Sequence, residues 1–209
     1  MTIDFNQAES DLTRDLRAAI GPTAADVAAA QARAGDAAAW TAAEVAWVHV
    51  PSPIGEIVLA ATDAGLVTLS YGERDGVLEH LATTVSPRVV EAPRTLAPMR
   101  RELEEHLAGR RQRFDMPLDW RLVRPGFTMR VLRATADVPF GAIATYREIA
   151  TAAGSPRGAR AAGQALGSNP LPIVVPCHRV LATGGGLGGY TSGLDRKRQL
   201  LAIEGVVVD

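Results

Sequence analysis

The sequence contains one cysteine, Cys177, in 209 residues. A lone thiol cannot close an intramolecular disulfide, and it cannot supply the thiolate set of a structural zinc site. No apolar stretch approaches the roughly 18 residues of a membrane span, and the polar, acidic amino terminus has none of the pattern of a secretion signal. These absences predict a protein of the reducing cytoplasm, without metal, cofactor or membrane partner, in which a free thiol persists.

Charge is distributed unevenly along the chain. The net charge at neutral pH is -1, but residues 1–46 carry -4, residues 47–120 carry -3 and residues 121–209 carry +6. The basic carboxy-terminal half could neutralise nucleic-acid phosphates, or it could be an ordinary solvated surface in an arginine-rich chain. A hydrophobic content of 47% is enough for the core of one large domain or two small ones.

Three segments differ in pattern. Residues 1–45 are rich in alanine and poor in large apolar side chains, which indicates a helical extension of unassigned function. Residues 46–120 are expected to form an α+β scaffold domain of ferredoxin-like or ribonuclease H-like topology, with a hairpin turning at Asp63 and Gly65. Its expected strands are 47–50, 56–61, 66–71 and 89–92, and its expected helices are 76–84 and 98–109.

Residues 121–209 read as a mostly helical domain. Helices are expected at 127–136, 145–153 and 157–167, and Thr145 with Glu148 forms a capping-box pattern at the start of the second. Two short helices across the Gly154-Ser155-Pro156 turn in a basic region suggest a helix-turn-helix. Spacing alone leaves a plain helical hairpin open, because many such hairpins share this pattern.

Cys177 stands in the run Val-Pro-Cys-His-Arg-Val, next to a possible proton partner, His178. A thiol with a pKa of about 8.5 is mostly protonated at neutral pH, so a nucleophilic cysteine needs a group that manages its proton. Adjacent side chains of an extended segment point to opposite faces, and a bend after Pro176 would be needed to bring the two together. An isolated cysteine is otherwise most simply a small buried hydrophobic residue.

The surroundings of Cys177 carry a specific combination of residues. Asn169-Pro170 precedes the cysteine segment, Tyr190 and Glu204-Gly205 follow it, and Arg160-Ala161-Ala162-Gly163 lies upstream. This combination strongly resembles the active-site half of the O6-alkylguanine-DNA alkyltransferases, and the resemblance runs from about 139 to 205. It is weaker but recognisable over the scaffold, whereas residues 1–45 have no counterpart. The resemblance implies a winged helix-turn-helix-like second domain.

The resemblance also implies a set of catalytic roles. Cys177 would accept the alkyl group from guanine O6 irreversibly, once per molecule, after activation through His178 and Glu204. Tyr146 would supply a proton to the leaving guanine, and Asn169 would tie the end of the preceding helix to the active-site segment. The expected activity is a single-turnover methylated-DNA–protein-cysteine methyltransferase acting in DNA repair.

The implied partner is double-stranded DNA containing O6-alkylguanine, bound by a monomer through the minor groove. A base inside a duplex cannot reach a buried thiol, so the nucleotide must be flipped out, and Arg160 would fill the vacated stack. The remaining residues implied at the DNA are Thr145, Ala161, Ala162 and Gly163. Those implied at the pocket for the flipped base are Leu166, Pro172, Val180, Tyr190 and Thr191.

Other functions fit the chain less well. An alkyltransferase-like sensor binds the damaged base without repairing it but lacks the cysteine, which Cys177 argues against. A methylation-responsive transcription activator would carry a four-cysteine zinc domain, which one cysteine excludes. A cysteine hydrolase would leave Arg160 and Tyr146 unexplained.

Overall fold

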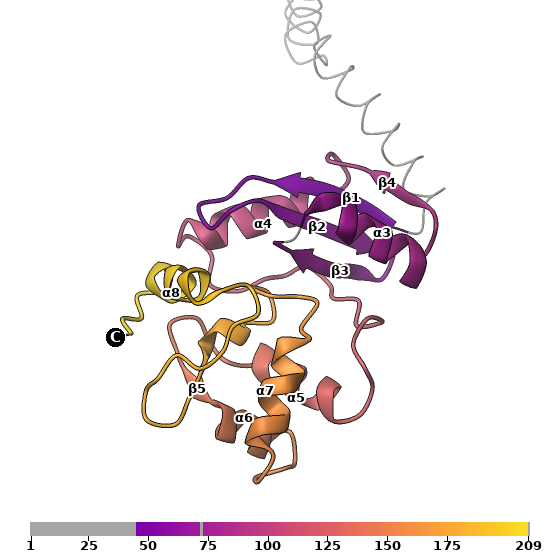
Figure 1. Ribbon diagram of the computed structural model, residues 1–209. Helices are drawn as coiled ribbons and strands as arrows, with labels where there is room; N and C mark the ends of the chain where they lie inside the picture. The colour runs from indigo at the N-terminus through magenta and orange to yellow at the C-terminus, as the bar shows by residue number, and fades with distance from the viewer. Residues whose placement is uncertain (1–44, 72, 209) are drawn as a thin grey trace, which may run out of the picture.

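The computed structural model describes residues 45–71 and 73–208. The predicted extension over residues 1–45 lies almost entirely outside these residues. The chain forms a sheet domain followed by a helical domain (Figure 1), as expected for the α+β class. Among the described residues, no helix is both long and apolar enough to cross a membrane.

The amino-terminal domain is built on a mixed sheet with the strand order β3-β2-β1-β4. β1 pairs antiparallel with β2 and parallel with β4, so the ribonuclease-like topology is the one observed, since the ferredoxin-like sheet is wholly antiparallel. The strands are β1 (Val45–Val50), β2 (Ile57–Thr62), β3 (Gly65–Ser70) and β4 (Val89–Glu91).

The predicted hairpin connects β2 and β3, and Gly65 is required where it turns. Its φ is +131°, and a Cβ at this position would lie 2.3 Å from the carbonyl oxygen of Pro117. That close approach exists because the chain leading into the second domain pairs with β3: Leu66 donates to Pro117 and Asp119 donates back to Leu66. The linker thus covers an edge of the sheet that would otherwise be open.

Helices cover both faces of the sheet. On one face of the sheet, Trp47 of β1 and Val58 of β2 pack with Leu81 of α3 (Arg74–Thr84). On the other face, their neighbours along each strand pack with Leu103 of α4 (Ala97–Leu107). This alternation follows from the two-residue period of a strand. Figure 1 shows the two helices on opposite sides of the sheet.

The carboxy-terminal domain contains α5, at the predicted bounds, and the two helices of the predicted helix-turn-helix, α6 and α7. The Thr145–Glu148 capping box is confirmed at the start of α6. A short parallel pair, β5 with β6, sets the start of α6 beside the segment that follows Cys177. The elements are α5 (Phe127–Ala136), β5 (Ala144–Thr145), α6 (Tyr146–Ala152), α7 (Ala159–Gly167), the 3-10 helix η1 (Cys177–Arg179), β6 (Val180–Leu181) and α8 (Leu194–Ile203).

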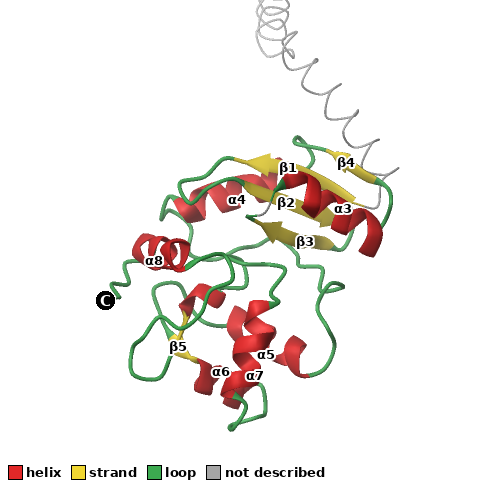
Figure 2. Ribbon diagram, in the orientation of Figure 1, coloured by secondary structure: helices red, strands yellow, loops and turns green. Residues whose placement is uncertain are grey.

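The two domains share one hydrophobic core, which runs from the α4 side of the sheet through α5, α7 and the Cys177 segment. Polar contacts cross the junction as well: Leu69 and Thr68 of β3 both donate to the carbonyl of Pro170. The end of α8 lies close to the end of α4, and loops between α7 and α8 run below the sheet (Figure 2). The site around Cys177 is therefore built at the domain junction.

Candidate active site

Cys177 begins a single turn of 3-10 helix directly after Pro176. The bend is held by a hydrogen bond from the Arg179 amide to the Pro176 carbonyl, at 3.0 Å. Cys177, His178 and Arg179 are all buried. Because the backbone turns here rather than running extended, consecutive side chains are separated by about a third of a turn instead of half a turn. The bend expected after Pro176 is therefore present.

The loop before Cys177 is strained. Ile173 is buried and has φ = 72°, a conformation that costs a β-branched residue about 1–3 kcal/mol. Asn169 braces this loop from the end of α7: its Nδ2 donates to the Val175 carbonyl at 2.8 Å, and its Oδ1 accepts from the Leu171 amide at 3.0 Å. The same Nδ2 lies 3.3 Å from the Cys177 sulfur, so one amide holds both the loop and the thiol.

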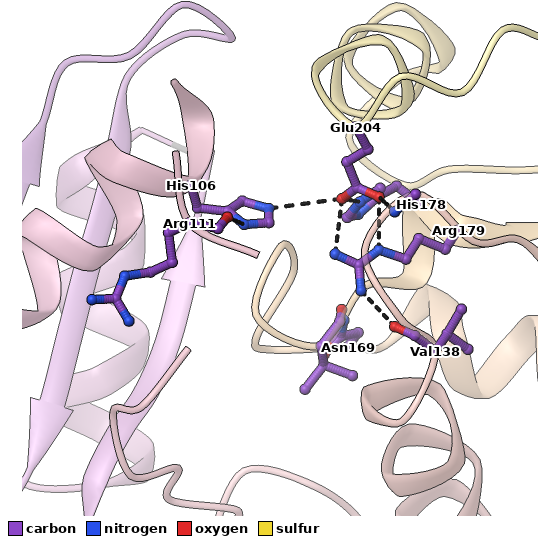
Figure 3. Close-up of polar contacts among 9 residues, drawn as sticks. His106, Arg111, Val138, Asn169, His178, Arg179 and Glu204 are labelled. Carbon is purple, nitrogen blue, oxygen red and sulfur yellow. Dashed lines mark hydrogen bonds and ion pairs between the residues drawn. The ribbon is translucent and has the colours of Figure 1, made fainter. Parts of the chain in front are cut away.

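Glu204, at the end of α8, is the centre of the polar network behind Cys177 (Figure 3). Its carboxylate accepts from His178 Nε2 at 2.8 Å and from Arg179 Nε and Nη2 at 2.9 Å each. Burial by itself would raise the pKa of Glu204, but the hydrogen bonds from His178 and Arg179 outweigh it and bring that pKa to about 2. The carboxylate is therefore ionised throughout the physiological range.

The protonation of His178 follows from its neighbours. Burial lowers its pKa, with Glu204 opposing the shift, so the ring is neutral at neutral pH. With a carboxylate at Nε2, the ring proton belongs on that nitrogen, which leaves a lone pair on Nδ1. Nδ1 is buried and has no hydrogen-bond partner among the described residues. His178 thus presents a free basic nitrogen, while Glu204 stabilises the imidazolium that forms when it takes a proton.

The thiol needs such a base. Burial raises the pKa of Cys177, and the hydrogen bond from Asn169 offsets only part of that effect. The resting group is a thiol rather than a thiolate, so attack by sulfur requires removal of its proton as the reaction proceeds.

A pocket of about 880 Å³ opens beside Cys177. Tyr146 stands in its wall, and its hydroxyl donates to the Gly189 carbonyl at 3.2 Å. Gly188 makes this packing possible, because a Cβ there would lie 2.7 Å from the Tyr146 ring. The predicted pocket residues that line it are Leu166, Pro172, Tyr190 and Thr191, and Asn169, Arg160 and Gly163 line it as well. An apolar cavity with a few convergent polar groups is the usual form of a small-molecule or base-binding site.

The helix at the pocket rim, α7, presents both arginine and small side chains outward. Arg160, in its first turn, and Ala161 are exposed. Thr145, which caps the neighbouring helix α6, is partly exposed. Arg160 thus adds an exposed positive side chain to the lining of the pocket.

The sequence matches family models and individual proteins of known activity. The model of the 6-O-methylguanine DNA methyltransferase ribonuclease-like domain matches residues 45–120, and that of the DNA binding domain matches residues 126–206. The methylated-DNA–protein-cysteine methyltransferase of Mycolicibacterium paratuberculosis is 42% identical over 155 residues, 74% of this chain and 89% of that protein. The constitutive one of Bacillus subtilis is 36% identical, over 73% and 91%. The chain belongs to the 6-O-methylguanine DNA methyltransferase family.

Solved structures of the methyltransferase family share the fold. The crystal structure of Mycobacterium tuberculosis OGT in complex with DNA matches with a TM-score of 0.66 at 36% identity, covering 76% of this chain and 92% of that one. The methyltransferase of Pyrococcus kodakaraensis matches with a TM-score of 0.55 at 27% identity, covering 78% and 99%.

Two residues that the family resemblance implied at the surface or pocket lie elsewhere. Ala162 is fully buried in the core, so its side chain cannot touch DNA; it lies on the inward face of α7, between the exposed Ala161 and the partly buried Gly163. Val180 is also fully buried and does not line the pocket, and its carbonyl accepts from Lys197 Nζ at 2.7 Å.

Lys197 is a functional candidate that was not predicted from the sequence. It is the only lysine in the chain and is completely buried. Besides Val180, its ammonium donates to the carbonyl of Leu187 and lies 3.5 Å from that of Gly189. Burial lowers its pKa to about 8, with Cys177 raising it in part. A single lysine one turn before Leu200 and Leu201 in an arginine-rich chain was the available signal.

Replacing Lys197 by methionine is expected to lower the free energy of unfolding by about 2–3 kcal/mol, because charge-assisted hydrogen bonds are lost and buried carbonyls stay unpaired. Arg198→Met is the matched control, since Arg198 is exposed and, among the residues that the structure describes, forms its ion pair with Asp195 at 3.4 Å. Urea denaturation of both variants measures the difference. Equal midpoints would show that the ammonium is not a structural anchor.

Tyr71, the second missed residue, comes from the scaffold domain. It follows β3, lines the pocket with Tyr190, and stacks under the Arg196 guanidinium, which lies 5.0 Å from its ring centre. Burial raises the pKa of both tyrosines, so both are neutral phenols. The sequence offered no signal for Tyr71, because only the docking of the domains brings it to the pocket.

Proposed function

We propose that this protein repairs O6-alkylguanine in duplex DNA by transferring the alkyl group to the sulfur of Cys177. The supporting observation is the arrangement of Cys177 beside the pocket, with the free Nδ1 of His178 next in the chain and Glu204 behind it. In the reaction the S–C bond forms as the C–O6 bond breaks. His178 takes the thiol proton, Tyr146 gives a proton to the leaving guanine, and the two transfers balance.

The reaction consumes the protein. A thioether has no leaving group that water could displace under mild conditions, and the buried site offers no second thiol, since Cys177 is the only cysteine. Each molecule would therefore act once. The relatives named methylated-DNA–protein-cysteine methyltransferases support this assignment, because the chain covers most of their length.

The proposed DNA partner is the minor groove of a duplex, approached by a monomer through α7. Arg160 would occupy the stack left by the flipped guanine, while Ala161 and the partly exposed Gly163 allow close approach. The solved complex of the mycobacterial OGT with DNA supports duplex DNA as the partner.

The test is the intact mass of the protein after incubation with a duplex oligonucleotide containing O6-methylguanine. One added methylene group per molecule is expected, located by peptide mapping at Cys177, with no further turnover in excess substrate. Duplex binding without any adduct would overturn the proposal and leave a non-catalytic sensor of the damaged base.

Arg160→Ala is expected to slow repair of duplex DNA roughly tenfold or more, because extrusion of a paired base costs a few kcal/mol that an inserted side chain offsets. Reaction with free O6-benzylguanine should be nearly unchanged, since a free base needs no flipping. Arg198→Ala, an exposed arginine on α8, is the control for loss of one positive charge. Equal rate losses on the two substrates would contradict the proposed role of Arg160.

A further inference from the structure

His106, in the last turn of α4, is a buried histidine of the scaffold domain that reaches the active-site network. Its Nδ1 lies 2.9 Å from the carbonyl oxygen of Arg111, and its Nε2 lies 3.7 Å from Oε1 of Glu204. Both side chains of the His106–Glu204 pair are essentially inaccessible, at 1% and 0% exposure. Figure 3 shows the Glu204 carboxylate between His106 on one side and His178 with Arg179 on the other.

Both polar neighbours of His106 are acceptors, and a neutral imidazole has one N–H. The shorter contact is to the Arg111 carbonyl, so the ring proton belongs on Nδ1. Nε2 then turns a lone pair toward Glu204, in agreement with its lack of a hydrogen-bond partner among the described residues. Burial lowers the pKa of His106 to about 4, against the opposing effects of the Arg111 carbonyl and Glu204. The ring therefore stays neutral near neutral pH.

The Glu204 carboxylate is already saturated by donors from its own domain. These are His178 Nε2, Arg179 Nε and Nη2, and the Gly141 amide at 3.2 Å. A carboxylate offers about four lone-pair sites. A further donor at the position of His106 would compete with His178 for Oε1. A non-donating ring at that place keeps the position closed and leaves Oε1 to His178.

The His106 ring is held in this orientation by aromatic contacts from both domains. Phe114 lies 4.7 Å away between ring centres at an angle of 41°, and Phe140 lies 5.5 Å away at 87°, which is an edge-to-face arrangement. Phe140 in turn packs near the Arg179 guanidinium, at 5.9 Å. Such packing leaves the ring no free rotation, so its nitrogens stay where the two acceptors face them.

The charged and titratable groups that face His106 are few. Glu204 faces it from the end of α8, and Arg179 and His178 face it from η1. In its own domain, Arg111 presents its backbone carbonyl to His106 but directs its guanidinium to Glu105 at 2.9 Å and Asp115 at 2.8 Å. We therefore expect substitution of His106 to change the pH dependence of the reaction by way of Glu204 and His178.

We propose that His106 is a positioning residue of alkyl transfer, through which the scaffold domain keeps Oε1 of Glu204 dry and reserved for His178. The proposal rests on the proposed alkyl transfer to Cys177. It adds no chemical step: His106 touches neither substrate nor thiol and acts through the carboxylate.

The test compares His106→Gln with His106→Phe, using the rate of reaction with free O6-benzylguanine as a function of pH. A glutamine amide can place an N–H near the position of Nε2 and donate to Oε1. His178 then becomes a weaker base, so the rate should fall about fivefold, the effect of one neutral hydrogen bond, and the acid limb of the profile should move to lower pH. Phenylalanine cannot donate, so it should leave the limb in place.

His106→Phe should nevertheless lower the midpoint of thermal unfolding, because the partly buried Arg111 carbonyl loses its donor. A positioning role predicts that the phenylalanine variant loses stability but keeps the acid limb of the pH–rate profile, whereas the glutamine variant shifts that limb. A role in packing alone would not distinguish the two variants in this way. His80→Gln, an exposed histidine on α3, is the matched control and should change neither quantity.

Two outcomes would overturn the role of His106. One is a glutamine variant with the rate and acid limb of the unaltered protein; the other is an equal shift of the limb in the glutamine and phenylalanine variants. Should neither variant fold, nitrogen chemical shifts of the unaltered protein decide, because the proposal requires an Nδ1-protonated, neutral His106. If the unaltered protein itself fails to accept the benzyl group, the proposed function fails instead, so the two failures are distinguishable.

Discussion

Cys177→Ser is expected to abolish alkyl transfer while leaving the fold and the affinity for damaged duplex unchanged. A serine hydroxyl is a far weaker acid than a thiol and a poorer nucleophile toward saturated carbon, so the base that suffices for sulfur does not activate it. The substitution is close to isosteric, and the Asn169 amide that now lies 3.3 Å from sulfur can bond an oxygen in its place. Intact mass after incubation with the alkylated oligonucleotide should show no adduct.

The affinity measurement decides what the Cys177→Ser result means. Undiminished binding of the variant to a duplex with O6-methylguanine, measured by fluorescence anisotropy, shows that only the chemistry was removed. An adduct that forms on the variant would place the acceptor elsewhere in the chain and contradict the assignment of Cys177.

Glu204→Gln is expected to impair both catalysis and stability. The variant leaves the buried Arg179 guanidinium without its anion, and breaking a buried ion pair costs about 3–5 kcal/mol. It also removes the charge that stabilises the His178 imidazolium, so the rate of alkyl transfer should fall about 10²-fold or more, as for loss of a general base. Urea denaturation and the rate of benzyl transfer measure the two effects separately.

The pH dependence of stability gives a further check on Glu204. Its pKa falls from an ordinary value of 4.5 in the unfolded chain to about 2 in the folded protein. The unfolded state therefore binds the proton first as pH drops, and the stability contributed by this carboxylate is complete above pH 4.5 and lost between there and pH 2. The glutamine variant should lack this component of the acid-induced loss.

Glu104→Gln is the matched control for the Glu204 variant. Glu104 is exposed and pairs with Arg100 at 3.5 Å one turn away on α4, a type of pair that contributes about 0.3–0.5 kcal/mol. Its removal should change neither the alkyl-transfer rate nor the acid limb of stability. A Glu204 variant as mild as this control would show that the charge of Glu204 is needed neither for the fold nor for alkyl transfer.

Local features of the fold were predictable because neighbouring residues specify them. The capping box at Thr145 and Glu148 and the bounds of α5 follow from side chains within one or two turns of each other. The hairpin at Gly65 follows from turn chemistry. The inward face of α7 was harder: a run of small residues does not reveal helical phase, so Ala162 was expected at the DNA but lies in the core.

The candidate site likewise contains features that neighbouring residues specify and features that only long-range packing creates. Cys177 and His178 are adjacent, so their relation depends on one bend of the backbone, which Pro176 introduces. The pairing of His178 with Glu204 could be inferred from resemblance to a family but not from spacing, because α8 must fold back to bring the carboxylate to His178. Lys197, Tyr71 and His106 carried no comparable motif, and each reaches the site by long-range packing.

By itself the sequence determined that one thiol is available, that a possible proton partner follows it in the chain, and that a predicted pair of short helices precedes it in a basic region. Only the tertiary structure decided the state of these groups. Burial keeps Cys177 protonated and His178 neutral, and the docking of the scaffold brings His106 to the far side of Glu204. The physical reason is that pKa values and donor counts depend on which groups exclude water from a site, and those groups come from both domains.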